Sequence, residues 1–170
     1  MITTDTSIFE FQKANEIDSW RIVNDGVMGG LSQSKISWNE KENTLGFSGE
    51  VSLDNNGGFA SVRATPQKFN QEEFKKIKLR VKGDGKVYQF RMRNTQNFDG
   101  IAYTLDFETE KNKWVEIELA VDDFQPTFRG RVYPQYGKFD SNDLQQIGIL
   151  IANKQVGEFH LEIDWVRVER

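Results

Sequence analysis

The sequence predicts an all-β fold, an antiparallel sandwich of two sheets, and three observations lead to this prediction. Apolar and polar residues alternate along most of the chain, as they do in strands with one buried face. Glycine-rich turns separate these segments, which number roughly ten and recur about every 8–15 residues. Helix signals amount to short turns, such as the capping-box pattern at residues 70–73. Two sheets of the jelly-roll kind would leave few exposed edges, and 170 residues suit a single domain over residues 1–170.

The N-terminal half contains five strand candidates in which the alternation is often interrupted. They span residues 8–11, 20–23, 34–38, 45–53 and 59–64. Glycine-rich loops at residues 25–30 and 54–58 separate some of these candidates. Asn56-Gly57 is a typical hairpin turn, so we expect the strands on its two sides to pair with each other.

The C-terminal half alternates more regularly. Residues 76–82 put three aliphatic side chains on one face and four cations on the other, and residues 87–93 put Tyr88, Phe90 and Met92 on one face. The glycine-rich turn between the two segments predicts that they form a hairpin. Later strand candidates include an apolar run that suits a strand covered on both faces, and a last strand that needs a bulge near its end; they span residues 101–107, 115–119, 146–152 and 159–163.

The composition limits the chemistry available to the chain. With 22 Lys and Arg against 26 Asp and Glu the net charge is −4, so the cation excess that nonspecific nucleic-acid binding needs is missing. There is no cysteine and one histidine, His160, which excludes disulfides and thiolate chemistry and weakens any histidine-based triad or zinc site. No segment approaches the roughly 18 apolar residues of a membrane-spanning helix. We therefore expect no enzyme activity, no resident cofactor and no nucleic-acid partner.

Several ordered segments carry a resemblance to a known family. They are residues 20–32, which include Asn24-Asp25-Gly26-Val27-Met28-Gly29-Gly30, and residues 55–63, 81–88, 124–130 and 147–159. Together they resemble the complex I intermediate-associated protein 30 family over most of the chain, from about residue 9 to about residue 168. The Asn-Asp-Gly-Val-Met-Gly-Gly segment is the most specific of them.

The resemblance implies a galactose-binding-like jelly-roll β-sandwich, in agreement with the alternation. It also implies a role, because eukaryotic members of the family act as assembly factors for respiratory complex I and as chaperone-like partners of assembly intermediates. The domain also occurs alone in bacteria and fused to short-chain-dehydrogenase-like proteins. We therefore expect a non-enzymatic binding or assembly module whose protein partner, as the resemblance implies, is a respiratory-complex assembly intermediate.

Two features depart from what the resemblance leads us to expect. Ala120-Val121 stands where the family pattern has Pro-Phe, which we interpret as local variation in an intact strand. The first residues include Asp5 and Glu10 and contain no arginine before Arg21, which is unlike a mitochondrial presequence. On this basis we expect a cytoplasmic protein.

Loop residues form the first group of candidate binding residues. Asn24 and Asp25 offer specific hydrogen bonds, Met28 offers an adaptable apolar contact, and Asn56 belongs to the second glycine-rich loop. The competing interpretation is structural, because Asn and Asp cap their own backbone in tight loops. Asp54 with nearby carbonyl groups could alternatively hold a structural calcium ion, although the EF-hand spacing is absent.

Arginines form the second group, namely Arg63, Arg91, Arg93 and Arg129. Alternation places Arg91 and Arg93 on the strand face opposite Tyr88 and Phe90. The face is either solvated and paired with carboxylates, or a concave polar surface whose planar guanidinium groups recognise carboxylates, sugars or backbone carbonyls.

The tryptophans and a stripe of cations leave alternative ligands and partners open. The four tryptophans would serve a carbohydrate-binding module if one or two were exposed on a concave face, and carbohydrate is therefore the alternative ligand. Cations between residues 75 and 86 form a stripe that is either an ordinary solvated face or a docking site for an acidic partner or an anionic membrane.

Overall fold

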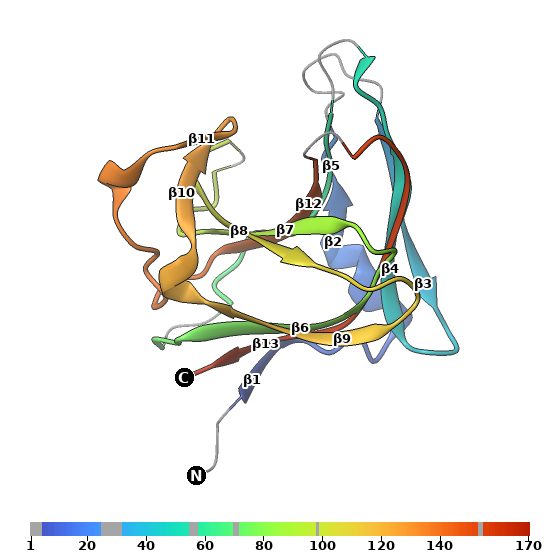
Figure 1. The fold of residues 1–170 in the computed structure, drawn as a ribbon. Coiled ribbons are helices and arrows are strands. Elements are labelled where there is room, and N and C mark those ends of the chain that lie inside the picture. Colours follow the sequence, from blue (N-terminus) through green and yellow to red (C-terminus); the bar gives the residue numbers. More distant parts are fainter. Residues whose placement is uncertain (1–4, 25–31, 55–57, 70–71, 98, 153–154) are drawn as a thin grey trace.

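The computed structural model is an antiparallel β-sandwich, which confirms the predicted fold class (Figure 1). It describes residues 5–24, 32–54, 58–69, 72–97, 99–152 and 155–170. Within these residues the helical elements are short 3-10 turns, η1 (Ala14–Ser19), η4 (Val121–Asp123) and η5 (Pro134–Tyr136). The capping-box pattern at residues 70–73 lies partly outside the described residues. In the described part of the chain, no helix has the length and apolar character needed to cross a membrane.

The first sheet has the strand order β3, β4, β13, β6, β9, and β1 also pairs with β13. Its strands are β1 (Asp5–Phe9), β3 (Gln33–Asn39), β4 (Thr44–Val51), β6 (Lys76–Lys82), β9 (Trp114–Ala120) and β13 (Gly157–Glu169). The long strand β13 joins the two halves of this sheet, because residues 157–163 pair with β4 and residues 162–169 pair with β6. A register shift between Ile163 and Trp165 confirms the predicted bulge.

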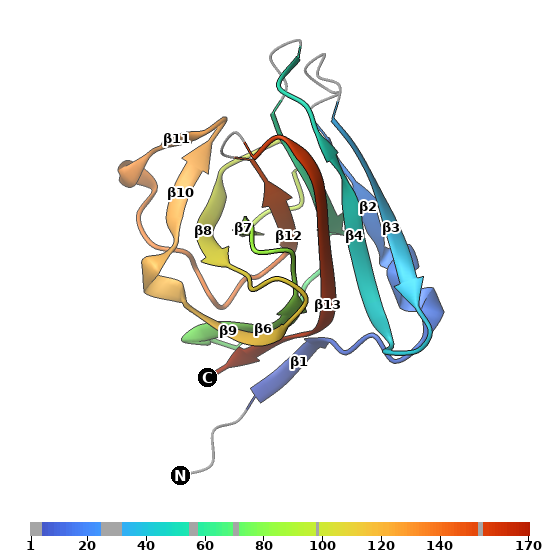
Figure 2. The ribbon, with the colours of Figure 1, turned by 45° about the vertical axis from the view of Figure 1, so that its right-hand side comes forward.

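The second sheet has the order β11, β10, β8, β7, β12, β5, β2. Its strands are β2 (Trp20–Ile22), β5 (Ala60–Ala64), β7 (Val87–Arg93), β8 (Ala102–Glu108), β10 (Gln125–Phe128), β11 (Arg131–Val132) and β12 (Gln146–Ile151). This sheet is strongly curved: β10 and β11 rise on one side of β7 and β8, and β5 and β12 rise on the other (Figures 1 and 2). The sheet face turned away from the core therefore lies inside the curve.

The core fills the space between the two sheets. Alternate residues of β6, such as Ile77 and Leu79, are fully buried from one side, and Tyr88, Phe90 and Met92 of β7 are buried from the other. Burial of each such side chain contributes roughly 1.5–3 kcal/mol. The period-two pattern of the sequence thus gives the correct inward faces of β6 and β7.

Both predicted hairpins are wrong. β6 and β7 lie in different sheets, and so do β4 and β5, so each connection crosses from one sheet to the other. The reason is that alternation identifies which side chains face the core but not which neighbour completes the backbone hydrogen bonds. A glycine-rich turn serves a crossing between sheets as well as a hairpin; here Gly83 approaches Thr109 so closely that a Cβ at residue 83 would lie 2.4 Å from the Thr109 Cβ. The second turn, Asn56-Gly57, lies outside the described residues.

Candidate functional site

Four arginines lie on the outer face of the second sheet. The register places Arg21 opposite Arg63, Arg63 opposite Gly148, and Gly148 opposite Arg91, so they form one row across β2, β5, β12 and β7. Arg93 follows two residues after Arg91 and therefore faces the same side. Phe90 and Met92 alternate with them and face the core. We call this surface, defined by Arg21, Arg63, Arg91 and Arg93, the arginine face.

The arginine face is partly enclosed by the segment that connects β7 to β8. Gln146 on β12 is 2% exposed, and its amide donates hydrogen bonds to the carbonyl oxygens of Thr95 (2.8 Å) and Asn97 (2.7 Å). Arg93 is 4% exposed, and its Nε donates to the carbonyl oxygen of Gly100 at 3.5 Å. The connection thus lies against the sheet and removes water from the guanidinium groups beside it.

Burial and mutual repulsion dominate the electrostatics of this face. Burial lowers the pKa of Arg63, Arg91 and Arg93 to about 10 each, and the neighbouring arginines add to the effect. All three groups still carry their proton at neutral pH. The negative charge of Asp99 opposes the lowering of the pKa of Arg63 and Arg93. The Asp99 carboxylate is itself exposed and lies 3.2 Å from Arg129 Nη2.

Few acceptors in the described part of the chain serve Arg91. Its Nη1 donates to Gln89 Oε1 at 2.6 Å, while its buried Nε has no hydrogen-bond partner among the described residues. Within the same residues neither Arg91 nor Arg93 forms an ion pair with a carboxylate. Buried charges in proteins are ordinarily paired, so Arg91 and Arg93 stand out as candidate binding residues.

The lysine-rich stripe on the first sheet has the opposite character. Lys78 Nζ lies 2.9 Å from Glu169 and 3.4 Å from Asp5, and Lys82 Nζ lies 3.1 Å from Glu162. Hydrogen bonds to these carboxylates raise the pKa of both lysines. The stripe is neutralised within the protein, so its charge is less available for docking than that of the arginine face.

Gly148 gives the arginine face its shape. A Cβ at this position would lie 3.0 Å from the Val62 carbonyl oxygen and 3.2 Å from Arg63 Cγ. The side chain of Arg63 therefore leans across the space that a larger residue would occupy, towards Arg91 on the far side of β12. The role of this glycine was not predicted, because it lies inside a continuous apolar run.

The remaining predicted binding residues lie elsewhere. Asn24 is held by the protein itself: its Oδ1 accepts hydrogen bonds from Ser34 Oγ (2.8 Å) and from the Ser61 backbone N–H (3.3 Å). This contact joins β3 of one sheet to β5 of the other. Arg129 lies in the β10–β11 turn, where its Nη2 is 3.2 Å from the Asp99 carboxylate, whose charge opposes the lowering of the Arg63 and Arg93 pKa. Three predicted residues lie outside the described part of the chain, namely Asp25, Met28 and Asn56.

Among the described residues of these strands, none of the side chains on the arginine face is aromatic, because Trp20, Tyr88 and Phe90 face the core. Trp20 packs in the core 5.0 Å from Phe9 between ring centroids, and Trp38 is half-buried against the core. Trp114 and Trp165 belong to the first sheet and lie beneath cations, for example Arg80 at 4.6 Å from the Trp114 ring. The tryptophans are therefore not a sugar-stacking platform on this surface.

Aromatic rings instead gather beside β10. Phe128, Tyr133 and Tyr136 line a cavity of about 280 Å³ with Gly100 and Ile101. Tyr133 and Tyr136 pack edge to face with their centroids 6.4 Å apart, and Tyr136 is exposed. This cavity is the place in the described structure where aromatic rings could stack on a sugar.

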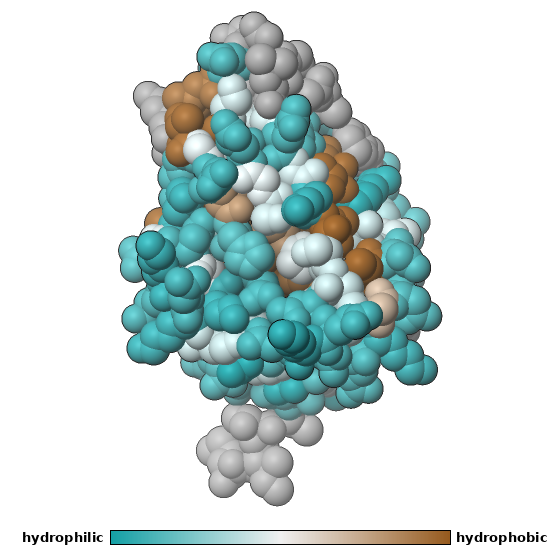
Figure 3. All heavy atoms as spheres, turned by 90° about the vertical axis from the view of Figure 1, so that its right-hand side faces the viewer, coloured by the Kyte–Doolittle hydropathy of each residue, from teal (hydrophilic) through white to brown (hydrophobic). Residues whose placement is uncertain are grey.

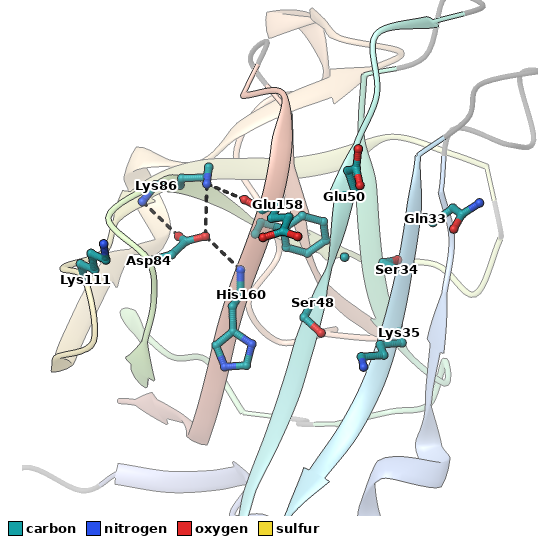
Figure 4. Close-up of a pocket in the computed structure, with 12 residues that line it drawn as sticks. Gln33, Ser34, Lys35, Ser48, Glu50, Asp84, Lys86, Lys111, Glu158 and His160 are labelled. Atoms are coloured by element: carbon teal, nitrogen blue, oxygen red, sulfur yellow. Dashed lines mark hydrogen bonds and ion pairs between the residues drawn. The ribbon is translucent and has the colours of Figure 1, made fainter.

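A larger polar groove of about 810 Å³ crosses the outer face of the first sheet (Figure 4). At one end Asp84 accepts hydrogen bonds from the His160 backbone N–H (2.9 Å) and the Tyr88 hydroxyl (3.0 Å), and it lies 3.6 Å from Lys86 Nζ. These contacts hold the β6–β7 connection against β13. The side of the molecule that carries β3 and β4 is mostly hydrophilic (Figure 3). His160 is exposed, as in an ordinary surface position, and no group of three metal-ligating side chains occurs among the described residues.

Comparison with solved structures first defines the class of fold, a galactose-binding-like β-sandwich of the kind found in carbohydrate-binding modules. The chain is similar over its full length to the family 11 carbohydrate-binding module of the cellulase Lic26A-Cel5E of Clostridium thermocellum, with a TM-score of 0.74, 15% identity and 97% of that chain covered. A module of the same family in complex with a β-1,3-1,4-mixed-linked tetrasaccharide matches 99% of this chain and 96% of its own, with a TM-score of 0.71 and 16% identity. At this identity the likeness shows the fold alone.

The sequence then identifies the family. Residues 9–163 match the model for complex I intermediate-associated protein 30, and the chain belongs to this family. Mitochondrial complex I intermediate-associated protein 30 of Mus musculus is 22% identical over 180 residues, covering 95% of this chain and 55% of its own length. A probable mitochondrial homologue of Caenorhabditis elegans is 25% identical, with 94% and 53% covered. The chain thus spans about half the length of these relatives.

The predicted cytoplasmic location is wrong. Three curated relatives are named as mitochondrial proteins, which points to mitochondria rather than the cytoplasm. The prediction used the composition of the first residues, but Asp5–Phe9 form strand β1 of the folded domain, and the composition of a folded domain does not determine the compartment.

Proposed function

We propose that this protein is a non-enzymatic binding module that holds a protein partner during the assembly of respiratory complex I. Membership of the family supports the assembly context, since its curated relatives are named for association with complex I intermediates. The observation that carries the proposal is the contrast between the two cationic surfaces. The lysine stripe is matched by carboxylates of the same chain, whereas Arg91 and Arg93 have none among the described residues.

The proposed mechanism is recognition by charge and hydrogen bonds. Buried guanidinium groups are desolvated before a partner arrives, so an anionic group of the partner meets them without displacing a full hydration shell. The proposed chaperone-like role is that the partner is held while it is incomplete and released when its own groups find their final contacts.

Affinity capture from mitochondria tests this proposal. The chain would be compared with the double variant Arg91→Met plus Arg93→Met and with a control, Lys35→Met plus Lys41→Met, that removes the same charge from exposed positions on β3 and in the β3–β4 turn. We expect wild type and control to recover the same complex I intermediate and the arginine variant to lose it. Equal recovery by all three proteins would refute the role of the arginine face.

The aromatic cavity beside β10 favours a second candidate function, carbohydrate binding, which the family 11 modules perform on the same fold. Binding of a glycan in an array, lost in Tyr136→Ala but kept in Arg91→Met plus Arg93→Met, would support this function over the first. Absence of glycan binding by the wild-type chain would exclude it.

A further inference from the structure

We infer that the arginine face binds the carboxylates of an extended acidic segment in the partner. This inference rests on the proposed function and names the chemistry of the partner that the site accepts. It follows from the spacing of the arginines, from the missing side chain at Gly148, and from the absence of aromatic rings and of free backbone N–H groups on the described part of this surface.

The spacing fits a peptide in an extended conformation. Arg91 and Arg93 stand two residues apart on β7, so their Cα atoms are about 7 Å apart and their side chains face the same way. In an extended peptide every second side chain also faces the same way, at the same spacing. Arg91 is the more accessible of the two, because Arg93 is 4% exposed beneath the β7–β8 connection. An acidic side chain of such a peptide therefore contacts Arg91, while Arg93 contributes positive charge from below.

Arg63 supplies a third group from the other side of β12. Its strand and that of Arg91 are both neighbours of β12, which places the two Cα atoms two inter-strand spacings, or roughly 10 Å, apart across Gly148. Because Arg63 leans into the space above Gly148, the two side chains approach each other over this gap. A carboxylate seated above Gly148 is within reach of both.

The surroundings favour carboxylates over phosphates and sugars. The planar guanidinium fork matches the two oxygens of a carboxylate. Phosphate sites typically add free backbone N–H groups at a helix start or a nest of turns, whereas the floor here is β-sheet backbone engaged in strand pairing. Neutral sugars typically stack on aromatic rings, and the described residues of these strands that face outward include none.

Fluorescence anisotropy with synthetic peptides tests the inference. The probe is a labelled peptide of alternating Glu and Ser, and the comparison peptide has Gln in place of every Glu, which keeps shape and removes charge. A phosphoserine peptide and an acidic polysaccharide are the other arms. The proteins are wild type, Arg91→Met plus Arg93→Met, Arg91→Lys plus Arg93→Lys, and the control Lys35→Met plus Lys41→Met.

We expect the Glu peptide to bind wild type and control at least tenfold more tightly than the Gln peptide. The methionine variant should lose at least tenfold in affinity, and the lysine variant should lose several-fold because it keeps the charge without the fork. Thermal unfolding of each variant shows that any loss of binding occurs in a folded protein.

Four results would overturn the inference: equal binding of the Glu and Gln peptides, an equal loss in the control, full binding by the lysine variant, or tighter binding of the phosphoserine peptide or the polysaccharide than of the Glu peptide. Failure here is separable from failure of the proposed function. If arginine-dependent capture of a complex I intermediate persists while the Glu peptide does not bind, only the carboxylate inference fails. If the peptide binds and capture is independent of the arginines, the proposed function fails.

Discussion

Replacing Arg91 by methionine should stabilise the fold while it abolishes partner binding. Arg91 keeps a positive charge in a buried position, and both burial and the neighbouring Arg63 oppose that charge. Methionine fills a similar volume with an unbranched side chain and has no charge to desolvate. A residue kept for packing alone would give the opposite result.

The size of the effect follows from the pKa. A fall of the Arg91 pKa from the usual range of arginine to about 10 corresponds to a penalty of about 3 kcal/mol for the charged form, at about 1.4 kcal/mol per tenfold change in proton affinity. The variant also loses the hydrogen bond from Nη1 to Gln89, and this loss cancels about 1.5–2 kcal/mol of the stabilisation gained by removing the charge. We expect a net gain of about 1 kcal/mol in the free energy of unfolding, or a rise of about 2–4 °C in Tm.

Urea and thermal unfolding at pH 7 measure this gain, with the exposed Lys41→Met as control, which should stay within about 0.5 kcal/mol of wild type. A double-mutant cycle with Arg93→Met adds a sharper test. Because Arg91 lowers the pKa of Arg93, removal of either charge relieves the other, so the two gains should sum to more than the gain of the double variant. A fall of more than about 1 kcal/mol in the free energy of unfolding of Arg91→Met would refute the argument that the Arg91 charge destabilises the fold.

Three further predictions concern the rest of the sandwich. Gly49→Ala should destabilise the fold by about 3 kcal/mol in urea unfolding, because a Cβ there would lie 2.0 Å from the Gln33 carbonyl oxygen; an unchanged midpoint would contradict this. Asn24→Ala should lose about 1–3 kcal/mol, since its amide joins the two sheets, and a neutral effect would show that its role is in binding instead. Hydrogen bonds from Arg167 lower the pKa of Glu10, so the stability from this pair is present above the unfolded pKa of about 4.3 and is lost as pH falls through the lower folded value. Glu10→Gln should therefore be less stable than wild type by about 1 kcal/mol at pH 7, and the difference should shrink as pH falls below about 4.3, whereas a difference that stays constant into the acid range would contradict the pair's contribution.

The sequence predicts the sandwich well because its signal is local. Alternation at residues 76–82 and 87–93 shows which side chains enter the core, and a strand with one apolar face buries that face in either sheet. Strand pairing is a long-range property, and the same turn signals fit a hairpin and a crossing between sheets. For this reason the inward faces were predicted correctly and both hairpins were not.

The candidate site is predictable in part for the same reason. Alternation places Arg91 and Arg93 on the outer face of their strand without any knowledge of pairing. The sequence does not show that Arg21 and Arg63 join them, because that depends on the order β2, β5, β12, β7. It also could not show that the similar cations of the lysine stripe are neutralised, since their carboxylates come from strands far along the chain.

Comparison of the two cationic surfaces distinguishes charges that carboxylates of the same chain neutralise from charges that the described residues leave without a carboxylate. Both alternate along a strand, and both look alike in the sequence. On the first sheet the partners are built in, for example Glu169 beside Lys78, so the charges stabilise the fold and raise the lysine pKa. On the second sheet burial lowers the pKa of Arg91 and Arg93, and the described chain provides them with no carboxylate. Under the proposed function, an anionic group of the partner neutralises the charges that oppose folding, and the rest of the sandwich supplies the stability that tolerates these charges in the free protein.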